Sequence, residues 1–515
     1  MTLVACDWKH AQRLVSARRL LFAVVGVVDA TRAASAGPDL AADVRGWNRT
    51  QWMLDLTYHG AQITSPWQPL TEEELAAMQE KAAGWQALAT RSDDGGHLQW
   101  GQAMPQVQYT DATRHTAARY DDVGDINAWT GQLLSALVHK YAVDHDAVTL
   151  QAASKIISGY NFSLTGCFED YVYVPRCWAI PHQPEIPWKA WRAYFASPTE
   201  QLNDTHGVHN CTLTGAEHIL WQGDASRDTY IGVLNGLASV VLTLRPRTEA
   251  PDPPAEDQYK LAVKLFERMY DRLAQDKFWI VPPPTCSHPG GRDEPHCPLV
   301  NPTASMQAAF MRVALSVNPE KYEVTTRRRY TEIVSLAMAE ERITPMNSGG
   351  YYGNNLLSQV WYVIVRFEAQ ESRASPLYSK LKAKMLQLLE HYAPHLQPNL
   401  PAYMVAALNL SKSESLYAHI VEAALWDFPA APNLWRHVDH RNNSDVSYAG
   451  AQDGTCAISQ GCSTTALLVR DRPPNEFVWQ INPTKLEGGD DHPPQTSFGG
   501  AFLLPFHVLR TTGLF

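Results

Sequence analysis

The chain has 515 residues, of which 45% are hydrophobic and 19% charged, and it contains 16 Trp, 21 Tyr and 14 Phe. This composition is typical of a folded protein with a large core and excludes a disordered chain, which would be poor in aromatic residues. The 43 basic and 53 acidic residues give a formal charge of −10, and no long basic tract offsets it. We therefore expect no nucleic-acid partner, because such a protein needs basic residues to neutralise phosphates.

The first predicted element is a secretory signal peptide at residues 1–36. Basic residues precede an apolar run from Leu20 to Val28, and Ala34-Ser35-Ala36 offers a small-x-small cleavage site. A short buried helix is the alternative, because the charged lead is longer than usual for a signal. No apolar stretch approaches the roughly 20 residues that span a bilayer, so the sequence predicts a secreted or extracellular protein without a membrane span.

Cysteines and glycosylation sequons agree with export. Three pairs of cysteines lie close together in sequence and predict local disulfides that close long loops: Cys167 with Cys177, Cys286 with Cys297, and Cys456 with Cys462. Because His288 and His296 lie between the two cysteines of the second pair, a zinc site is the alternative there. Six Asn-x-Ser/Thr sequons predict N-glycosylation at Asn48, Asn161, Asn203, Asn210, Asn409 and Asn442.

Helical periodicity dominates the chain from about residue 71 to residue 426. Thr71-x-x-Glu74 has the spacing of a capping box, which marks a helix start. Apolar residues then recur at three- and four-residue steps, whereas the alternation that marks β-strands is hard to find before residue 430. Helices are predicted near 38–56, from 71, over 125–141, from about 148, and over 229–244, 259–273, 303–317, 321–341, 354–370, 376–392 and 412–426.

Two of these helices differ in a way that indicates inner and outer positions. The segment 229–244 is apolar almost all round, which predicts an inner helix, and Gly232 and Gly236 would permit a neighbouring backbone to approach closely. The segment 259–273 has one apolar stripe and one charged stripe, which predicts an outer helix. Long loops at 160–228, 281–302 and 429–500 hold the paired cysteines and many aromatic residues. No linker divides the chain, so we expect one domain at 37–515, loop-rich from about residue 429.

Acidic, polar and aromatic residues cluster at the starts of two predicted helices. One is Asp125-Ile126-Asn127-Ala128-Trp129-Thr130-Gly131, and the other is Gly223-Asp224-Ala225-Ser226-Arg227-Asp228-Thr229-Tyr230. The first is similar to a helix start of unsaturated-glucuronyl-hydrolase-like toroids, and the second resembles a signature of exported toroid proteins. About twelve alternating inner and outer helices resemble the all-α (α/α)6 toroid of six-hairpin glycosidases and polysaccharide lyases. This resemblance covers roughly two-thirds of the chain and implies a carbohydrate substrate or ligand.

Aspartates at these helix starts are the catalytic candidates. Breaking a sugar linkage needs a proton donor at the leaving oxygen and a second group that acts on water, on the anomeric carbon or on a C5 proton. Asp224 and Asp228 are four residues apart, so one helical turn would place them on one face, and Asp125 would support them. The alternative is that each aspartate is an ordinary N-cap, or that one pairs with Arg227 to brace the loop.

Aromatic, amide and guanidinium groups nearby are the predicted substrate contacts. Arg227 has the fork geometry that holds a carboxylate, and aromatic rings stack on sugar rings. The predicted contacts are Arg227, Tyr230, Trp221, Trp129, Tyr352 and Asn354. An ordinary N-cap at Asn354 or Asn355 is the alternative, because both follow Tyr351-Tyr352-Gly353 at the start of another predicted helix.

The chain lacks several motifs that would point to other activities. It has no Gly-x-Ser-x-Gly, P-loop, His-Glu-x-x-His or dinucleotide-binding fingerprint, so we expect neither a cofactor nor a catalytic metal. The sequence thus predicts a secreted glycoside hydrolase or polysaccharide lyase. Its aspartates would act in the funnel that the loops at one end of a toroid's inner helices form. The alternative is a non-catalytic extracellular protein that binds glycans or interacts with the matrix or cell wall through the same funnel.

Overall fold

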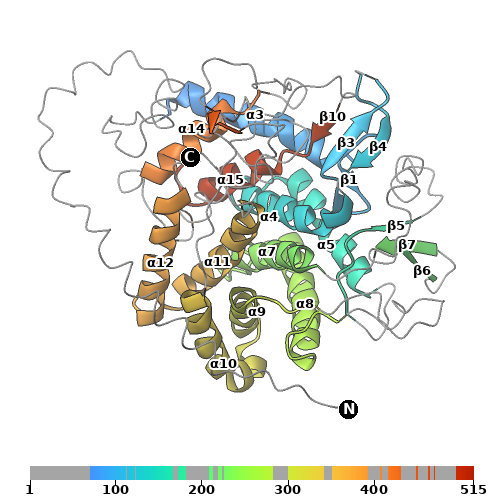
Figure 1. Ribbon diagram of the computed structural model, residues 1–515. Coiled ribbons are helices and arrows are strands. Elements are labelled where there is room, and N and C mark those ends of the chain that lie inside the picture. Colours follow the sequence, from blue (N-terminus) through green and yellow to red (C-terminus); the bar gives the residue numbers. More distant parts are fainter. Residues whose placement is uncertain are drawn as a thin grey trace, which may run out of the picture. The chain divides into compact units, whose positions relative to one another are not determined.

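The structure is a computed structural model that describes most of the chain after residue 69. The described residues are 70–111, 113–121, 123–165, 172–180, 208–212, 218–222, 226–281, 300–340, 351–392, 416–430 and 495–515, with 406, 408, 448–449, 462–463 and 469. The predicted signal peptide and the predicted helix near 38–56 lie outside these residues. Helix predominates in the described part, as expected (Figure 1).

The described helices other than α15, for which no range was predicted, correspond to predicted segments. They are α3 (Glu72–Thr90), α4 (Ile126–Asp144), α5 (Ala147–Thr165), α7 (Arg227–Thr243), α8 (Pro253–Gln275), α9 (Ala304–Val317), α10 (Pro319–Glu340), α11 (Tyr351–Ser372), α12 (Pro376–Tyr392), α14 (Leu416–Asp427) and α15 (Gly500–Arg510). The capping box at the start of α3 is confirmed. The amide of Glu74 donates to Thr71 Oγ1 at 3.1 Å, and the amide of Thr71 donates to Glu74 Oε2 at 2.8 Å.

Although the alternation that marks β-strands is hard to find before residue 430, the structure has strands there. Short strands occupy two regions there: β1 (Leu98–Gln99), β2 (Gln102–Ala103), β3 (Gln106–Tyr109) and β4 (Ala117–Asp121) before α4, and β5 (Trp178–Ala179), β6 (Val208–Thr212) and β7 (His218–Gln222) before α7. Strands β1 and β2 are only two residues long and wholly buried, so they show no polar–apolar alternation. Near the C-terminus lie β8 (Tyr448–Ala449), β9 (Cys462–Ser463) and β10 (Gln495–Ser497).

Antiparallel pairing joins strands that are far apart in the sequence. The sheets have the orders β1-β2, β10-β3-β4, β5-β7-β6 and β8-β9. Because β10 pairs with β3, the segment just before the last helix lies beside the segment that leads into α4 (Figure 1). The start of α15 is thereby brought close to the start of α4.

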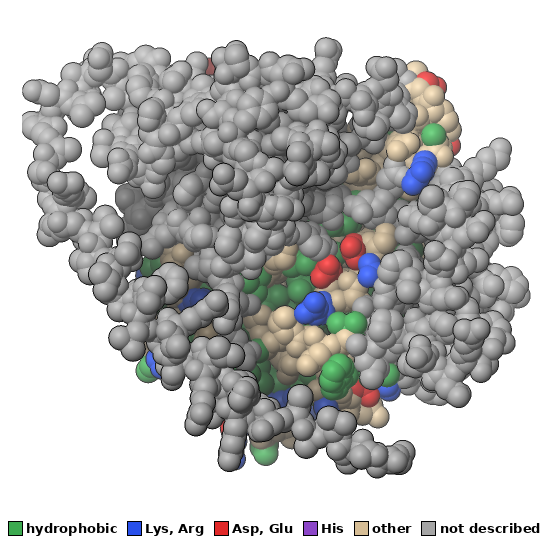
Figure 2. All heavy atoms as spheres, viewed as in Figure 1, with side chains coloured by type: hydrophobic (Ala, Val, Ile, Leu, Met, Phe, Trp, Pro, Cys, Tyr) green, Lys and Arg blue, Asp and Glu red, His purple; other side chains and the backbone are tan. Residues whose placement is uncertain are grey.

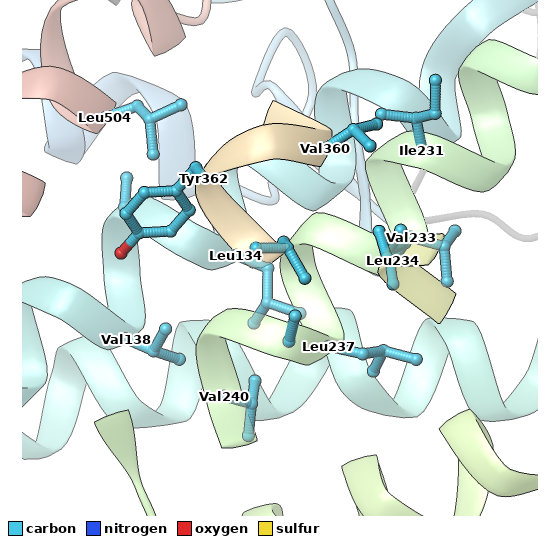
Figure 3. Packing of buried hydrophobic residues seen from close by; sticks show 14 of the residues in the cluster. Leu134, Val138, Ile231, Val233, Leu234, Leu237, Val240, Val360, Tyr362 and Leu504 are labelled. Atoms are coloured by element: carbon cyan, nitrogen blue, oxygen red, sulfur yellow. The ribbon is translucent and has the colours of Figure 1, made fainter. Parts of the chain in front are cut away.

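Helices α4, α7, α9, α11 and α15 are buried on almost every side, whereas α3, α5, α8, α10 and α12 each keep an exposed face. The distinction between an inner helix at 229–244 and an outer helix at 259–273 is therefore confirmed by α7 and α8. Figure 3 shows how four of the inner helices meet: Leu134 and Val138 from α4, Leu237 from α7, Tyr362 from α11 and Leu504 from α15 lie in one apolar cluster. Burial of this cluster is the main stabilising contribution of the inner helices.

Contacts between α4 and α7 show that these two inner helices run in the same direction. The backbone of Gly232 touches that of Ala128, one turn further on Gly236 touches Gly131, and the hydroxyls of Ser135 and Ser239 lie 2.8 Å apart. The residue numbers rise together on both helices, which is the mark of a parallel pair. The predicted close backbone approach at Gly232 and Gly236 is confirmed.

The outer helix α8 runs opposite to α4. Its N-cap residue, Asp252, accepts a hydrogen bond from the hydroxyl of Tyr141 in the last turn of α4, at 2.6 Å. The start of α8 therefore lies beside the end of α4.

Helix α10 is parallel to α8 and antiparallel to the two inner helices beside it. The side-chain amide of Asn318 donates to Glu267, and the hydroxyls of Tyr270 and Thr326 lie 2.9 Å apart, so residue numbers rise together on α8 and α10. A single residue, Asn318, separates α9 from α10, so the chain reverses there and the two helices pack against each other.

The direction of helix α11 follows from its contacts with α10. Tyr330 of α10 donates to Glu368 of α11, and Arg327, one turn earlier on α10, donates to Glu371, which lies further along α11. Residue numbers fall on one helix as they rise on the other, so α10 and α11 are antiparallel. Together these contacts make α4, α7, α9 and α11 parallel, with their N-terminal ends at one end of the helical assembly.

The long connections also belong to that end. Residues 166–226, 282–303, 341–350 and 428–499 each lead into the start of an inner helix, namely α7, α9, α11 and α15. Connections that leave inner helices are shorter: residue 318 after α9, residues 145–146 after α4, residues 373–375 after α11 and residues 244–252 after α7. Long connections in compact helical proteins often carry function. We therefore expect a functional site at the N-terminal end of the inner helices.

Candidate functional site at the N-terminal end of the inner helices

Two of the three predicted catalytic aspartates lie at the starts of neighbouring inner helices. Asp125 immediately precedes α4, and Asp228 is the second residue of α7. Both lie about one turn before the contact between Ala128 and Gly232, and the helices are parallel, so the two carboxylates belong to the same end of the pair. Asp224 lies outside the described residues.

Asp125 is held by an ion pair. Its Oδ1 atom lies 2.9 Å from Nη1 of Arg176, and about one-fifth of each side chain is exposed. Asp125 occupies the N-cap position of α4 without making a side-chain capping hydrogen bond. The N-cap alternative is therefore not realised for Asp125, and the guanidinium of Arg176 compensates its charge instead.

Asp228 is not the cap of its helix either. Ser226 is the N-cap of α7, and its Oγ atom accepts a hydrogen bond from the amide of Asp228 at 3.2 Å. The Asp228 side chain is partly buried in the first turn of α7, where the helix dipole favours a negative charge. Arg227 beside it is exposed. The sequence thus places one carboxylate and one guanidinium at the start of α7 and uses a third residue for capping.

Residues 172–180, where the sequence predicted only a disulfide at Cys177, lie against both helix starts. The side-chain amide of Asn127 donates to the carbonyl of Pro175 at 2.6 Å. The backbone amide of Asn127 donates to the carbonyl of Arg176 at 3.4 Å. The backbone amide of Val174 donates to the hydroxyl of Tyr230 at 3.4 Å. Residues 172–180 are therefore bonded to α4 and to α7.

Three of the predicted substrate contacts are core residues. Trp129, Trp221 and Tyr230 are 0%, 1% and 3% exposed, so their rings are enclosed by protein. Trp221 packs edge-on against Tyr173 with ring centroids 5.9 Å apart, and Tyr230 receives the hydrogen bond from Val174. The prediction that these rings stack on sugar is wrong, because an inner helix and a buried strand turn their aromatic residues into the core.

Tyr352 and Asn354 lie in the first turn of α11, at the same end as Asp125 and Asp228. Their side chains are outside the described set. Because α11 begins at Tyr351, neither Asn354 nor Asn355 is its N-cap, which corrects the alternative that the sequence left open. The next residue, Asn355, is 2% exposed.

The predicted disulfides and glycosylation sites remain predictions. Cys177 is buried and Cys462 lies in β9, but the remaining predicted cysteine positions, Cys167, Cys286, Cys297 and Cys456, lie outside the described residues. Among the sequons, Asn161 is partly buried within α5 and Asn210 lies in β6, and the other four are outside the described part.

Sequence reasoning missed Arg176 and Asn127 as parts of the site. Arg176 is separated from Asp125 by 51 residues, and no local pattern marks such a pair. Asn127 stands inside the motif 125–131, so its position in the motif was the available signal. The described surface in Figure 2 carries acidic and basic side chains near one another, and neither charge forms a broad patch on that face.

Within the described ranges, no group of three or more His, Cys, Asp or Glu side chains is arranged to hold a metal ion. Over the same part of the chain, every helix is too short or too polar to cross a membrane.

Comparisons with known proteins give one structural likeness. No family model matches the chain, and no curated protein matches its sequence. A solved structure titled "Bacteroides ovatus GH9" is similar over 86% of this chain and 83% of its own, with a TM-score of 0.39 and 10% sequence identity.

Proposed function

We propose that this protein acts on carbohydrate, as a glycoside hydrolase or a polysaccharide lyase, at the N-terminal end of its inner helices. The observation that carries the proposal is the glycine contact between α4 and α7, because it sets the starts of these parallel helices side by side. Asp125 and Asp228 belong to those starts, and Asp224 lies four residues before Asp228 in the sequence. Paired carboxylates are the groups that glycoside hydrolysis requires.

The proposed architecture is the (α/α)6 toroid. Parallel inner helices α4, α7, α9 and α11 support it, as do antiparallel outer partners and the packing of α15 against α4. Buried helical residues Ala406 and Leu408 mark where the fifth inner helix of such a toroid belongs.

Each residue has a proposed role. Asp228 acts as base or nucleophile, because its place at a helix start favours the ionised carboxylate. Asp224 is the proposed proton donor, four residues before it. Arg227 binds substrate through its exposed guanidinium. Asp125, whose charge Arg176 compensates, supports the site and is not the first choice for proton transfer.

The proposal includes export. The predicted signal peptide, the three cysteine pairs and the six sequons together support a secreted or extracellular glycoprotein. No part of the proposed chemistry needs a cofactor or a metal.

A panel of soluble polysaccharides tests the activity. Purified protein is incubated with xylan, carboxymethylcellulose, starch, alginate, pectate and chondroitin sulfate. New reducing ends without ultraviolet absorbance indicate hydrolysis, whereas both together indicate elimination. Turnover of one class supports the proposal, and the absence of product from every member contradicts it.

The second candidate is a non-catalytic glycan-binding protein of the matrix or cell wall. The ion pair between Asp125 and Arg176 favours this candidate, because it gives one of the three candidate catalytic carboxylates a structural role. Retention on an immobilised polysaccharide of the same panel, with no product formed, would support it over the enzyme.

A further inference from the structure

We infer that residues 172–180 are the positioning element of the proposed site and that Arg176 is its principal positioning residue. The inference rests on the proposed function and adds to it a residue that the sequence did not single out. Its basis is geometric: one short segment is bonded to the starts of α4 and α7, which carry Asp125 and Asp228, and to strand β7.

The first attachment is to the start of α4. Nη1 of Arg176 donates to the Asp125 carboxylate at 2.9 Å and to the carbonyl of Gly124 at 3.2 Å. Asn127 holds the same segment from the helix side through the carbonyls of Pro175 and Arg176. Since Asn127 is 0% exposed, this attachment is shielded from water, which strengthens its hydrogen bonds.

The second attachment is to the start of α7. The hydroxyl of Tyr230 accepts the hydrogen bond from the amide of Val174, and Tyr230 is only two residues after Asp228. Tyr230 is 3% exposed, so its ring is fixed by packing. Residues 172–180 are thereby placed relative to the turn that carries Asp228.

The third attachment is to β7, the strand that ends two residues before Asp224 in the sequence. Trp178 of β5 pairs with Trp221 of β7, and Tyr173 packs edge-on against the Trp221 ring. Trp221 is three residues before Asp224 in the sequence. Strand β7 is therefore held by the same segment that is bonded to α4 and α7.

This arrangement matters because the separation of catalytic carboxylates decides both the rate and the stereochemical outcome of glycoside hydrolysis. A displacement of 1 Å at a reacting group costs on the order of 100-fold in rate. Arg176 is the charged link in the segment, and it acts on substrate only through Asp125 and through the placement of the helix starts. It is a positioning residue and not a catalytic one.

The test compares Arg176→Met, Arg176→Lys and Tyr230→Phe with the natural protein on whichever polysaccharide of the panel is turned over. Arg176→Met is expected to lower kcat by about 10- to 100-fold while KM and the melting temperature change little. Arg176→Lys keeps the positive charge and should restore part of kcat. Tyr230→Phe removes one hydroxyl while keeping the ring, and should lower kcat in the same direction.

Arg328→Met is the matched control, because Arg328 lies on α10 with its side chain 91% exposed, and kcat should not change. An Arg176→Met protein with natural kcat overturns the inference and leaves the proposed function standing. A natural protein that turns over nothing in the panel overturns the proposed function, and the inference fails with it. If Arg176→Met does not fold, Tyr230→Phe decides: an unchanged kcat there overturns the inference.

Discussion

Gly131 of α4 and Gly232 of α7 meet backbone to backbone. A Cβ atom added at Gly131 would overlap the carbonyl of Gly232, and one added at Gly232 would overlap the backbone of Ala128. Only glycine at these two positions allows the helices to approach so closely. The direction and spacing of the two helix starts, and with them the relation of Asp125 to Asp228, depend on this contact.

Replacing either glycine by alanine should destabilise the protein. Gly131→Ala or Gly232→Ala forces backbone against backbone, and overpacking of this kind typically costs about 1–3 kcal/mol or more. Urea denaturation measures the free energy of unfolding. The control is Gly84→Ala on α3, where a Cβ meets no atom within 4 Å, so helix propensity should make that variant at least as stable as the natural protein. Equal stability of all three variants would contradict the close contact.

A second prediction concerns the buried charge network that joins α9 to α11. Nε of Arg312 lies 2.6 Å from Glu368 Oε1, and the two side chains are only 3% and 6% exposed. Arg312→Met leaves Glu368 buried without its positive partner, which costs about 3–5 kcal/mol in comparable pairs.

The double variant Arg312→Met/Glu368→Gln should recover part of that loss, because the remaining group is neutral. Urea denaturation measures both variants. Arg328→Met serves as control, since its pair with Glu332 is exposed and should contribute under about 1 kcal/mol. Equal losses in Arg312→Met and Arg328→Met would show that the network is not the source of stability.

A third prediction follows from a buried histidine. His139 lies between the Tyr362 hydroxyl at 3.1 Å and the Thr511 hydroxyl at 3.2 Å, and burial, together with the nearby charge of Arg366, lowers the pKa of His139 to about 3. The unfolded chain takes up this proton near the ordinary pKa of about 6.5, whereas the folded chain does not. Stability should therefore be complete above pH 6.5 and fall as the pH drops from about 6.5 towards 3.

The slope approaches about 1.4 kcal/mol per pH unit for each such histidine once the pH is well below 6.5. His507, whose pKa is also lowered by burial, adds to it in the same direction. Melting temperatures between pH 7.5 and 4 measure the effect. His139→Gln should flatten the profile, whereas Tyr362→Phe removes the partner and leaves the titrating group, so the decline should persist. A profile equally steep in His139→Gln and the natural protein would refute the assignment.

Local signals in the sequence predicted most of the helices. The capping box of Thr71 and Glu74 acts within one turn, and the apolar character of 229–244 follows from burial on all sides, so both are readable without the fold. Gly232 and Gly236 predicted a close approach, although the partner helix could not be named. Short buried strands such as β1 and β2 escaped prediction, since two residues cannot show an alternation.

The site was predicted less completely because it is made by contacts between distant segments. Asp125 and Asp228 were predicted as candidate catalytic residues at helix starts. Arg176 was not predicted, because it pairs with Asp125 across 51 residues of sequence. Trp129 and Trp221 were misassigned as sugar contacts. Residue type alone does not distinguish an aromatic ring that faces a binding site from one that is packed in the core.

The most direct measurement is the turnover of the panel polysaccharides by Asp228→Asn beside Asp257→Asn. Asp257 is an exposed aspartate on α8, so both changes remove one negative charge and add one amide. Loss of general acid–base work typically lowers the rate by about 100- to 10,000-fold, and we expect a loss in that range for Asp228→Asn with an unchanged melting temperature. Asp257→Asn should retain natural turnover. Natural turnover in Asp228→Asn would contradict a catalytic site at the start of α7.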